Sequence, residues 1–292
     1  LLDDPERAIL YGYMPREAFC DMWLGKLKEV IDAYRPDLIW FDSWLHELPE
    51  SYLQEFAAYY YNRAAAWGRE VVVTRKQNDL PLSMSLEDFE KGRAEDLTEN
   101  VWLTDDTISK GSWSYTEGLR IKDADEVVDT LVDIVSKNGQ LLLNISPRAD
   151  GVIPENQRSV LHALGDWLQV NGEAIYHSRP WLAYGEGPTR MARGGHFVGH
   201  VQYGAGDIRY TRSKDGSALY VIALGRPANR SLKIRALSLQ RGEVTGIRLL
   251  CSPMALQWQQ SETGLNVTLP GEAPGEHAYV LKVIGKGLTR VQ

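Results

Sequence analysis

The sequence predicts an α/β fold in which a partial (β/α)8-type barrel, without its front half, is followed by an all-β antiparallel sandwich. Residues 1–180 alternate helical patterns with short apolar strands, and residues 181–292 contain short strands about ten residues apart, separated by turns. Charge divides at the same place, with a net charge of −14 before residue 181 and +7 after it. We therefore expect two domains, a barrel portion at 1–180 and an accessory β-sandwich at 181–292.

The elements of the first region follow from apolar residues at helical spacing and from short apolar runs. Proline or glycine ends several of the helices, as at Pro36 and Gly68. Asp123 is expected to cap a helix, because acidic residues follow it in the first turn. The predicted helices cover residues 16–34, 52–67, 123–137 and 154–170, and the predicted strands cover 37–42, 70–74, 100–104 and 140–146.

The number of strand–helix units points to half of a barrel. About four units can be counted, whereas a closed barrel has eight. We therefore expect the first strands of the barrel to precede Leu1, in keeping with a start without Met and without a visible leader. An open doubly wound sheet is the alternative. No glycine-rich phosphate loop follows any predicted strand, which argues against a nucleotide-binding version of it.

The second region has the pattern of an antiparallel sandwich, with apolar strands separated by turn residues. His196 and His200 lie in it, and on a strand they would be about 13 Å apart, too far to chelate one ion. We interpret them as a surface pair. The predicted strands begin near residues 208, 218, 231, 246, 264 and 278.

Composition narrows the class of protein. Of 292 residues, 43% are hydrophobic and 24% are charged, which is typical of a globular chain. A net charge of −7 argues against nucleic acid as a partner, and the longest apolar runs are too short for a membrane span. Two cysteines, Cys20 and Cys251, exclude a disulfide scaffold or a cysteine-rich zinc site. We expect no metal and no cofactor; export and self-association into a homo-oligomer stay open.

Asp42 is the strongest single candidate for chemistry. It follows three apolar residues at the end of a predicted buried strand and is flanked by Trp40 and Trp44. In barrel enzymes the carboxyl ends of strands carry the reacting groups, and an aspartate there can trap an oxocarbenium-like centre as an ester. The alternative is an aspartate that only caps the next helix.

Hydrolysis of a glycoside also requires a second carboxyl with a raised pKa. The residue types alone do not choose among the acidic residues downstream of Asp42. The candidates are Glu87, Asp88, Glu90, Glu95, Asp96, Glu99, Asp105 and Asp106, most of which we expect in solvated loops.

Seven short stretches, in collinear order between residues 15 and 181, resemble the α-L-fucosidases of glycoside hydrolase family 29. Each match is weak by itself, but seven in the same order make chance a poor explanation. The stretches are 34–42 (YRPDLIWFD), 88–93 (DFEKGR), 102–108 (WLTDDTI), 112–115 (SWSY), 137–151 (KNGQLLLNISPRADG), 154–157 (PENQ) and 171–176 (NGEAIY).

The resemblance implies roles for particular residues. Asp42 matches the nucleophile of the family, and Glu90 best matches the general acid/base. The family also takes pocket histidines and a tryptophan from the first barrel strands, which we expect before Leu1. The implied substrate-binding residues are Trp40, a basic residue that is either Arg75 or Lys76, and the aromatic residues Trp102 and Trp113.

The function implied by the resemblance is that of an exo-acting, retaining α-L-fucosidase that releases terminal fucose from fucosylated glycans by double displacement. Retention requires the two carboxyl groups to lie about 5–5.5 Å apart. Two alternatives stay open. One is a truncated or degenerate relative that binds fucose or glycans without catalysis, and the other is a barrel hydrolase with a different sugar specificity.

Overall fold

The structure is a computed structural model that describes residues 13–191, 193–271, 275 and 277–290. These residues form two compact units, and the chain passes from the first to the second between Asp88 and Phe89. Each unit has a hydrophobic core of its own. The strands of the parallel sheet follow the order β1 (Leu38–Ile39), β2 (Val72–Arg75), β3 (Leu86–Glu90), β4 (Trp102–Thr107) and β5 (Gly139–Asn144). The point where the units divide lies within β3.

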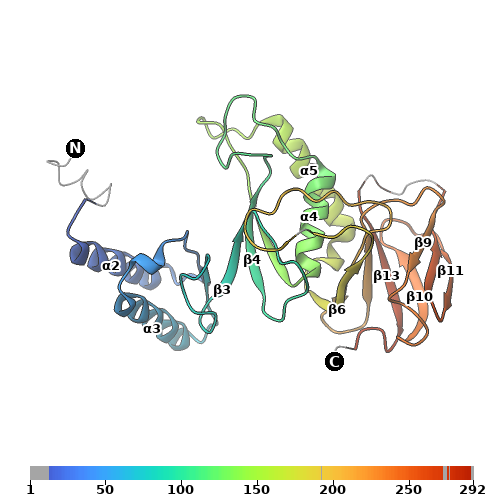
Figure 1. Ribbon diagram of the computed structural model, residues 1–292, viewed down its shortest axis with the longest axis horizontal. Coiled ribbons are helices and arrows are strands. Elements are labelled where there is room, and N and C mark those ends of the chain that lie inside the picture. The colour runs from blue at the N-terminus through green and yellow to red at the C-terminus, as the bar shows by residue number, and fades with distance from the viewer. Residues whose placement is uncertain (1–12, 192, 272–274, 276, 291–292) are drawn as a thin grey trace. The chain divides into compact units, whose positions relative to one another are not determined.

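The two helices of the first unit lie side by side (Figure 1), and they share one hydrophobic core with the short parallel strands. Phe56 and Tyr60 lie one turn apart on the second helix and stack with their ring centroids 6.1 Å apart, at the centre of this core. Gly68 ends that helix in the left-handed conformation, with φ of 67°, as the sequence predicts. The elements are α2 (Arg16–Tyr34), β1 (Leu38–Ile39), the 3-10 helix η1 (Leu45–Glu47), α3 (Glu50–Trp67), β2 (Val72–Arg75) and β3 (Leu86–Glu90).

Two strands of the parallel sheet differ from the prediction. The strand predicted at 37–42 is β1, which covers only Leu38–Ile39, so the chain leaves the sheet before Asp42. β3 was not predicted, and it pairs parallel to β2, with Thr74 opposite Leu86 and Arg75 opposite Glu87. The sheet therefore has five parallel strands instead of four. β3 was hidden because three of its five residues are acidic.

The second unit begins with the remaining β/α elements. β4 pairs parallel to β5 over six residues, from Trp102 opposite Gly139 to Thr107 opposite Asn144. Asp123 caps α4 as predicted, and its carboxylate accepts a hydrogen bond from the Glu126 amide while the Glu126 carboxylate accepts one from the Asp123 amide. The elements are β4 (Trp102–Thr107), α4 (Ala124–Ser136), β5 (Gly139–Asn144), α5 (Glu155–Asn171) and the 3-10 helix η2 (Gly172–Ala174).

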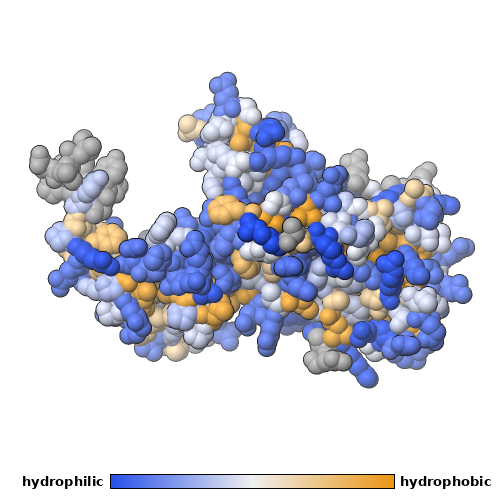
Figure 2. Space-filling model, viewed as in Figure 1, coloured by the Kyte–Doolittle hydropathy of each residue, from blue (hydrophilic) through white to orange (hydrophobic). Residues whose placement is uncertain are grey.

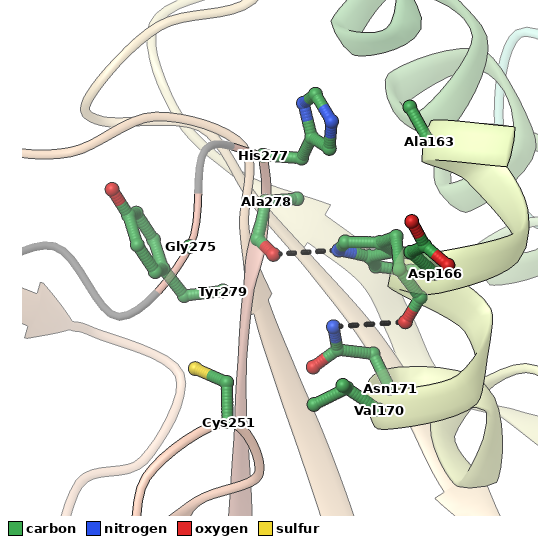
Figure 3. Close-up of a pocket in the computed structure, with 10 residues that line it drawn as sticks. Ala163, Asp166, Val170, Asn171, Cys251, Gly275, His277, Ala278 and Tyr279 are labelled. Carbon is green, nitrogen blue, oxygen red and sulfur yellow. Dashed lines mark hydrogen bonds between the residues drawn. The ribbon is translucent and has the colours of Figure 1, made fainter. Parts of the chain in front are cut away.

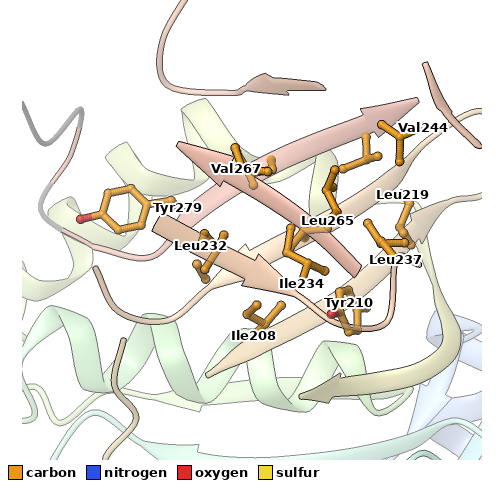
Figure 4. Packing of buried hydrophobic residues seen from close by; sticks show 14 of the residues in the cluster. Ile208, Tyr210, Leu219, Leu232, Ile234, Leu237, Val244, Leu265, Val267 and Tyr279 are labelled. Atoms are coloured by element: carbon orange, nitrogen blue, oxygen red, sulfur yellow. The ribbon is translucent and has the colours of Figure 1, made fainter. Parts of the chain in front are cut away.

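The predicted β-sandwich is confirmed as a five-stranded and a three-stranded antiparallel sheet, in the orders β10-β13-β8-β7-β6 and β11-β12-β9. Aliphatic residues of both sheets interdigitate between them (Figure 4). β6 and β11 were not predicted. The strands are β6 (Ser178–Glu186), β7 (Ile208–Ser213), β8 (Leu219–Ala223), β9 (Ser231–Ile234), β10 (Glu243–Leu249), β11 (Gln257–Ser261), β12 (Gly264–Thr268) and β13 (Tyr279–Lys286).

The five-stranded sheet is covered on both faces at its central strand, β8. One face packs on the three-stranded sheet, and the other packs on α4 and α5 through residues such as Val128 and Trp167 (Figure 1). Every residue of β8 is accordingly buried, as a continuous apolar run predicts. The Trp167 indole N–H donates to the Ala278 carbonyl over 2.8 Å and ties α5 to the end of this sheet. Helices of the β/α region thus share a core with the sandwich, and the domain division near residue 180 stays a prediction.

A buried charge cluster joins α4 to β7. The Asp133 carboxylate is fully buried and accepts hydrogen bonds from Arg209 (2.7 Å), Lys137 (2.9 Å) and Arg93 (3.4 Å). Burial by itself would raise the pKa of Asp133, but the three cations outweigh it and hold this pKa well below its usual value. The carboxylate is therefore charged at neutral pH and fully compensated.

The surface is mixed in character. On the face shown in Figure 2, hydrophobic residues form separate patches among hydrophilic ones. The most exposed large apolar side chains include Tyr34 (79%) and Trp44 (70%), both in the first unit. In the part of the chain that the structure describes, no helix is both long and apolar enough to cross a membrane.

Candidate active site

Asp42 lies in the loop that follows β1. Ser43 and Trp44 after it have positive φ values of 30° and 70°, so the chain turns sharply at a cost that only a fixed surrounding can sustain. The Asp42 side chain is 70% exposed. It borders an open pocket of about 350 Å³ that is lined mainly by apolar groups, among them Trp23, Phe41 and Trp44. A carboxylate at the mouth of an apolar pocket can reach a ligand directly.

A buried cation stands next to this carboxylate. Lys76 follows β2 directly, its side chain is 2% exposed, and its Nζ lies 3.4 Å from Asp42 Oδ1. The same Nζ lies 5.0 Å from the centroid of the Trp40 ring. Arg75 instead donates to Glu87 over 2.6 Å and to the Leu80 carbonyl over 2.7 Å. Of the two basic residues, the structure therefore brings Lys76 next to Asp42.

Trp40 is held by a residue that the sequence did not single out for this role. The indole N–H of Trp40 donates to Asp88 Oδ2 over 2.6 Å, and Asp88 on β3 is fully buried. This charge-assisted hydrogen bond fixes the plane of a ring that is still 37% exposed. Trp40, Asp42 and Lys76 therefore form one constellation in the first unit.

Glu90 belongs to the second unit and is the last residue of β3. Its side chain is half-buried. Its amide N–H donates to His196 Nδ1 over 2.9 Å, and its carbonyl accepts from the Phe197 amide over 2.8 Å. Lys91, the next residue, places its Nζ 4.4 Å from the centroid of the Trp113 ring. Trp113 is thus a near neighbour of the segment that carries Glu90.

Trp102 has the surroundings of a core residue. It is 2% exposed, and its indole N–H donates to the Lys137 carbonyl over 3.0 Å. The ring lies against Phe89, and a Cβ added at Gly139 would stand 2.4 Å from it, so β5 requires glycine there. Contact between Trp102 and a sugar stays a prediction.

The second unit has several further pockets, among them two that lie beside α4 and α5. One of about 550 Å³ is bordered by acidic residues at the start of α4, and there burial, reinforced by Asp125, raises the pKa of Asp129 to about 8. Another, of about 270 Å³, lies between α5 and the segment before β13, and Asp166 is the one carboxyl among the described residues that line it (Figure 3). Neither contains a residue that the sequence predicts as catalytic. Across the described ranges, no group of three or more His, Cys, Asp or Glu side chains is placed to hold a metal ion.

Two contacts of the candidate site residues escaped sequence reasoning. Asp88 was only one of eight candidate acids, and His196 was interpreted as half of a surface pair. The one signal for His196 was its position directly after Gly194-Gly195, because adjacent glycines often mark a close approach between backbones.

Fold and candidate sites together define the class: a protein with barrel-type β/α units, carboxylates near the ends of its strands and a C-terminal β-sandwich. The chain belongs to the α-L-fucosidase family. The family description "Alpha-L-fucosidase" matches residues 4–173, and "Alpha-L-fucosidase C-terminal domain" matches residues 203–284. The resemblance predicted from the seven stretches is thereby confirmed.

Individual proteins similar to this chain support the same family. Tissue α-L-fucosidase of Rattus norvegicus is 32% identical over 89% of this chain and 54% of its own length, and that of Homo sapiens is 31% identical over 90% and 54%. The crystal structure of Thermotoga maritima α-fucosidase in complex with fucose superposes with a TM-score of 0.70 at 28% identity, over 91% of this chain and 56% of that one. The chain therefore spans about half the length of the relatives it matches.

Proposed function

We propose that this chain carries the nucleophile and the general acid/base of an exo-acting, retaining α-L-fucosidase that acts on fucosylated glycans. The observation that carries the proposal is the Asp42 carboxylate, 70% exposed at an open pocket, with a buried ammonium 3.4 Å away. A carboxylate in solvent contact beside a fixed cation suits attack on a positively charged sugar carbon. Membership of the α-L-fucosidase family supports fucose as the sugar.

Each residue of the first constellation has a distinct part in the proposed reaction. Asp42 Oδ attacks the anomeric carbon, and the bond from that carbon to the leaving oxygen breaks. Lys76 holds the Asp42 carboxylate in place, since its ammonium is nine-tenths or more buried and cannot move far. Trp40 offers an indole face, fixed by Asp88, for the apolar side of the sugar ring.

Glu90 completes the proposed double displacement. In the first step its carboxylic acid gives its proton to the leaving oxygen, and the fucosyl ester of Asp42 forms. In the second step the Glu90 carboxylate takes a proton from water, whose oxygen bonds to the anomeric carbon while the ester bond breaks. The two inversions at that carbon give net retention.

An aryl α-L-fucoside tests the proposal in the natural protein that carries this sequence. We expect release of the aryl group, and a loss of about 10³-fold or more in kcat for Asp42→Ala, because no nucleophile is left. Asp37→Ala is the matched control, since Asp37 lies just before β1 with a side chain that is 76% exposed. Absence of release above the Asp42→Ala background would overturn the proposal, and fucose binding in calorimetry without turnover would then establish the non-catalytic alternative.

The choice between Arg75 and Lys76 is tested separately. Lys76→Met leaves the Asp42 carboxylate without its neighbouring ammonium, so we expect a fall in kcat/KM, whereas Arg75→Met removes a contact to Glu87 that lies away from Asp42. Lys76→Arg, which keeps the charge, should recover part of the rate. A larger effect of Arg75→Met on kcat/KM, at equal folded fractions, would assign the role to Arg75 instead.

A further inference from the structure

A segment of the connection between β6 and β7 lies against the residues that follow β3. Residues 193–198 pair with residues 90–93 through backbone hydrogen bonds, and all of these residues belong to the second unit. The Arg93 amide donates to the Gly195 carbonyl over 3.1 Å, the Gly195 amide donates to the Arg93 carbonyl over 2.9 Å, and the Val198 amide donates to the Lys91 carbonyl over 3.0 Å. The segment leaves the sandwich to make these contacts (Figure 1).

Both backbone polar groups of Glu90 bond to this segment. Its N–H donates to the ring nitrogen Nδ1 of His196, and its carbonyl accepts from the Phe197 amide. Because Nδ1 accepts, the proton of the neutral imidazole lies on Nε2. The His196 ring also meets the Phe89 ring edge to face, with centroids 5.7 Å apart. The His196 ring thus supplies the acceptor that a backbone carbonyl of a neighbouring strand would supply in a β-sheet.

Glycines on both sides make this approach possible. A Cβ at Gly92 would stand 2.0 Å from the Gly195 carbonyl oxygen, and a Cβ at Gly194 would stand 2.6 Å from the Glu95 amide nitrogen. Gly195 itself has φ of 106°, which other residues rarely adopt. Three glycines are therefore required for one contact, which distinguishes it from a loop that merely rests on a surface.

Residues on the other side of Glu90 are also fixed. The Lys91 amide donates to the Asp105 carbonyl over 2.8 Å, and its ammonium donates to the Gly111 carbonyl over 2.6 Å while facing the Trp113 ring. Lys91 has φ of 44°, so the chain bends immediately after Glu90. With the backbone fixed before, at and after Glu90, the direction in which its side chain leaves the backbone is fixed as well.

We infer that the 193–198 segment positions Glu90, and that His196 is the positioning residue which sets its carboxyl for proton transfer. This inference rests on the proposed acid/base role of Glu90. The positioning segment connects β6 and β7 of the sandwich, so the inference gives a part of the sandwich connection a role in the proposed reaction. The segment lies between the two matched family regions, 4–173 and 203–284.

Leaving-group dependence tests the inference in the natural protein. Protonation matters for phenyl α-L-fucoside, whose leaving group is basic, and hardly matters for the 2,4-dinitrophenyl substrate. We expect His196→Phe, which keeps a ring against Phe89 but has no acceptor, to lower kcat/KM at least about tenfold on the phenyl substrate and little on the dinitrophenyl one. His196→Asn, whose amide oxygen can accept in place of Nδ1, should recover most of that loss. His200→Phe, on the same connection, is the matched control and should leave both values unchanged.

Glu90→Gln separates the two proposals. Suppose that Glu90→Gln lowers kcat/KM for the phenyl substrate much more than for the dinitrophenyl one. If His196→Phe does not show this difference, or lowers kcat/KM equally for both substrates, the positioning role is wrong while the acid/base role of Glu90 stands. If Glu90→Gln itself shows no such difference, the proposed function is wrong at Glu90, and the inference falls with it. Recovery by His196→Asn, with equal folded fractions, supports positioning over a general structural effect.

Discussion

Two aspartates, one in each compact unit, show how the same side chain can serve opposite purposes. Asp42 in the first unit is 70% exposed and has one cation beside it, whereas Asp133 in the second is fully buried among three. An exposed carboxylate with one partner keeps lone pairs for a ligand, while a buried one with three partners has most of them engaged. Exposure and partner number, more than residue type, therefore distinguish the proposed reactive position from the structural one.

Removal of each carboxylate should give contrasting effects, and the larger is expected at Asp42. Asp42→Asn should lower the proposed fucosidase activity about 10³-fold or more, because the amide cannot form the ester. The urea midpoint of unfolding should stay close to that of the parent, since the side chain is mostly exposed. A variant that unfolds much more readily would show that Asp42 has a structural role and would break the contrast.

Asp133→Asn should mainly lower the free energy of unfolding. Three buried cations would lose the negative charge that compensates them, and breaking such a buried pair costs about 3–5 kcal/mol of folding free energy. Denaturant unfolding measures this, with Asp166→Asn on the exposed side of α5 as control. A loss below about 1 kcal/mol would mean that water reaches the cluster.

Gly92→Ala sharpens the comparison within the second unit. Its methyl group would meet the Gly195 carbonyl at 2.0 Å and push the 193–198 segment away from Glu90. We expect a loss of roughly 1–3 kcal/mol in the free energy of unfolding. Gly111→Ala, where an added Cβ meets nothing within 4 Å, is the control. Equal stability of the two variants would contradict the close packing described for this segment.

The smallest expected effect is a pH dependence in the acidic pocket at α4. The pKa of Asp129 is raised to about 8 in the folded protein, so between about pH 4 and pH 8 the folded state keeps a proton that the unfolded chain has lost. Its contribution to stability is therefore present below pH 4 and lost as the pH rises through 8. The difference in the free energy of unfolding between Asp129→Asn and the parent should be at least about 1 kcal/mol more favourable to the variant at pH 9 than at pH 4. This is the equivalent of roughly one pKa unit. Parallel pH curves for variant and parent would refute this.

Sequence patterns predicted the elements whose signals are local. The Asp123 cap, the Gly68 stop and the apolar run of β8 depend on residues within a few positions of one another, and all are present. β3 escaped because its acidic residues are buried or paired by partners far along the chain. Asp88 accepts from Trp40, 48 residues away, and Glu87 pairs with Arg75, 12 residues away.

The candidate site divides in the same way. Asp42 could be proposed from its place after an apolar run, and its exposure beside a pocket is compatible with that role. The hydrogen bond between His196 and Glu90 spans 106 residues and ends on a backbone amide. Since every residue except proline offers the same amide, no pairing of side-chain types could have revealed it.

The five-stranded sheet, covered on both faces at β8, limits how the sandwich can be exchanged between proteins. If the sandwich alone were grafted onto another barrel, Val128 and Trp167 would no longer cover the face of β8 and β13, and the apolar residues of that face would be exposed to solvent. A workable chimera would have to carry α4 and α5 along with the strands. Gene fusions that exchange such modules should accordingly keep these helices and the sandwich together.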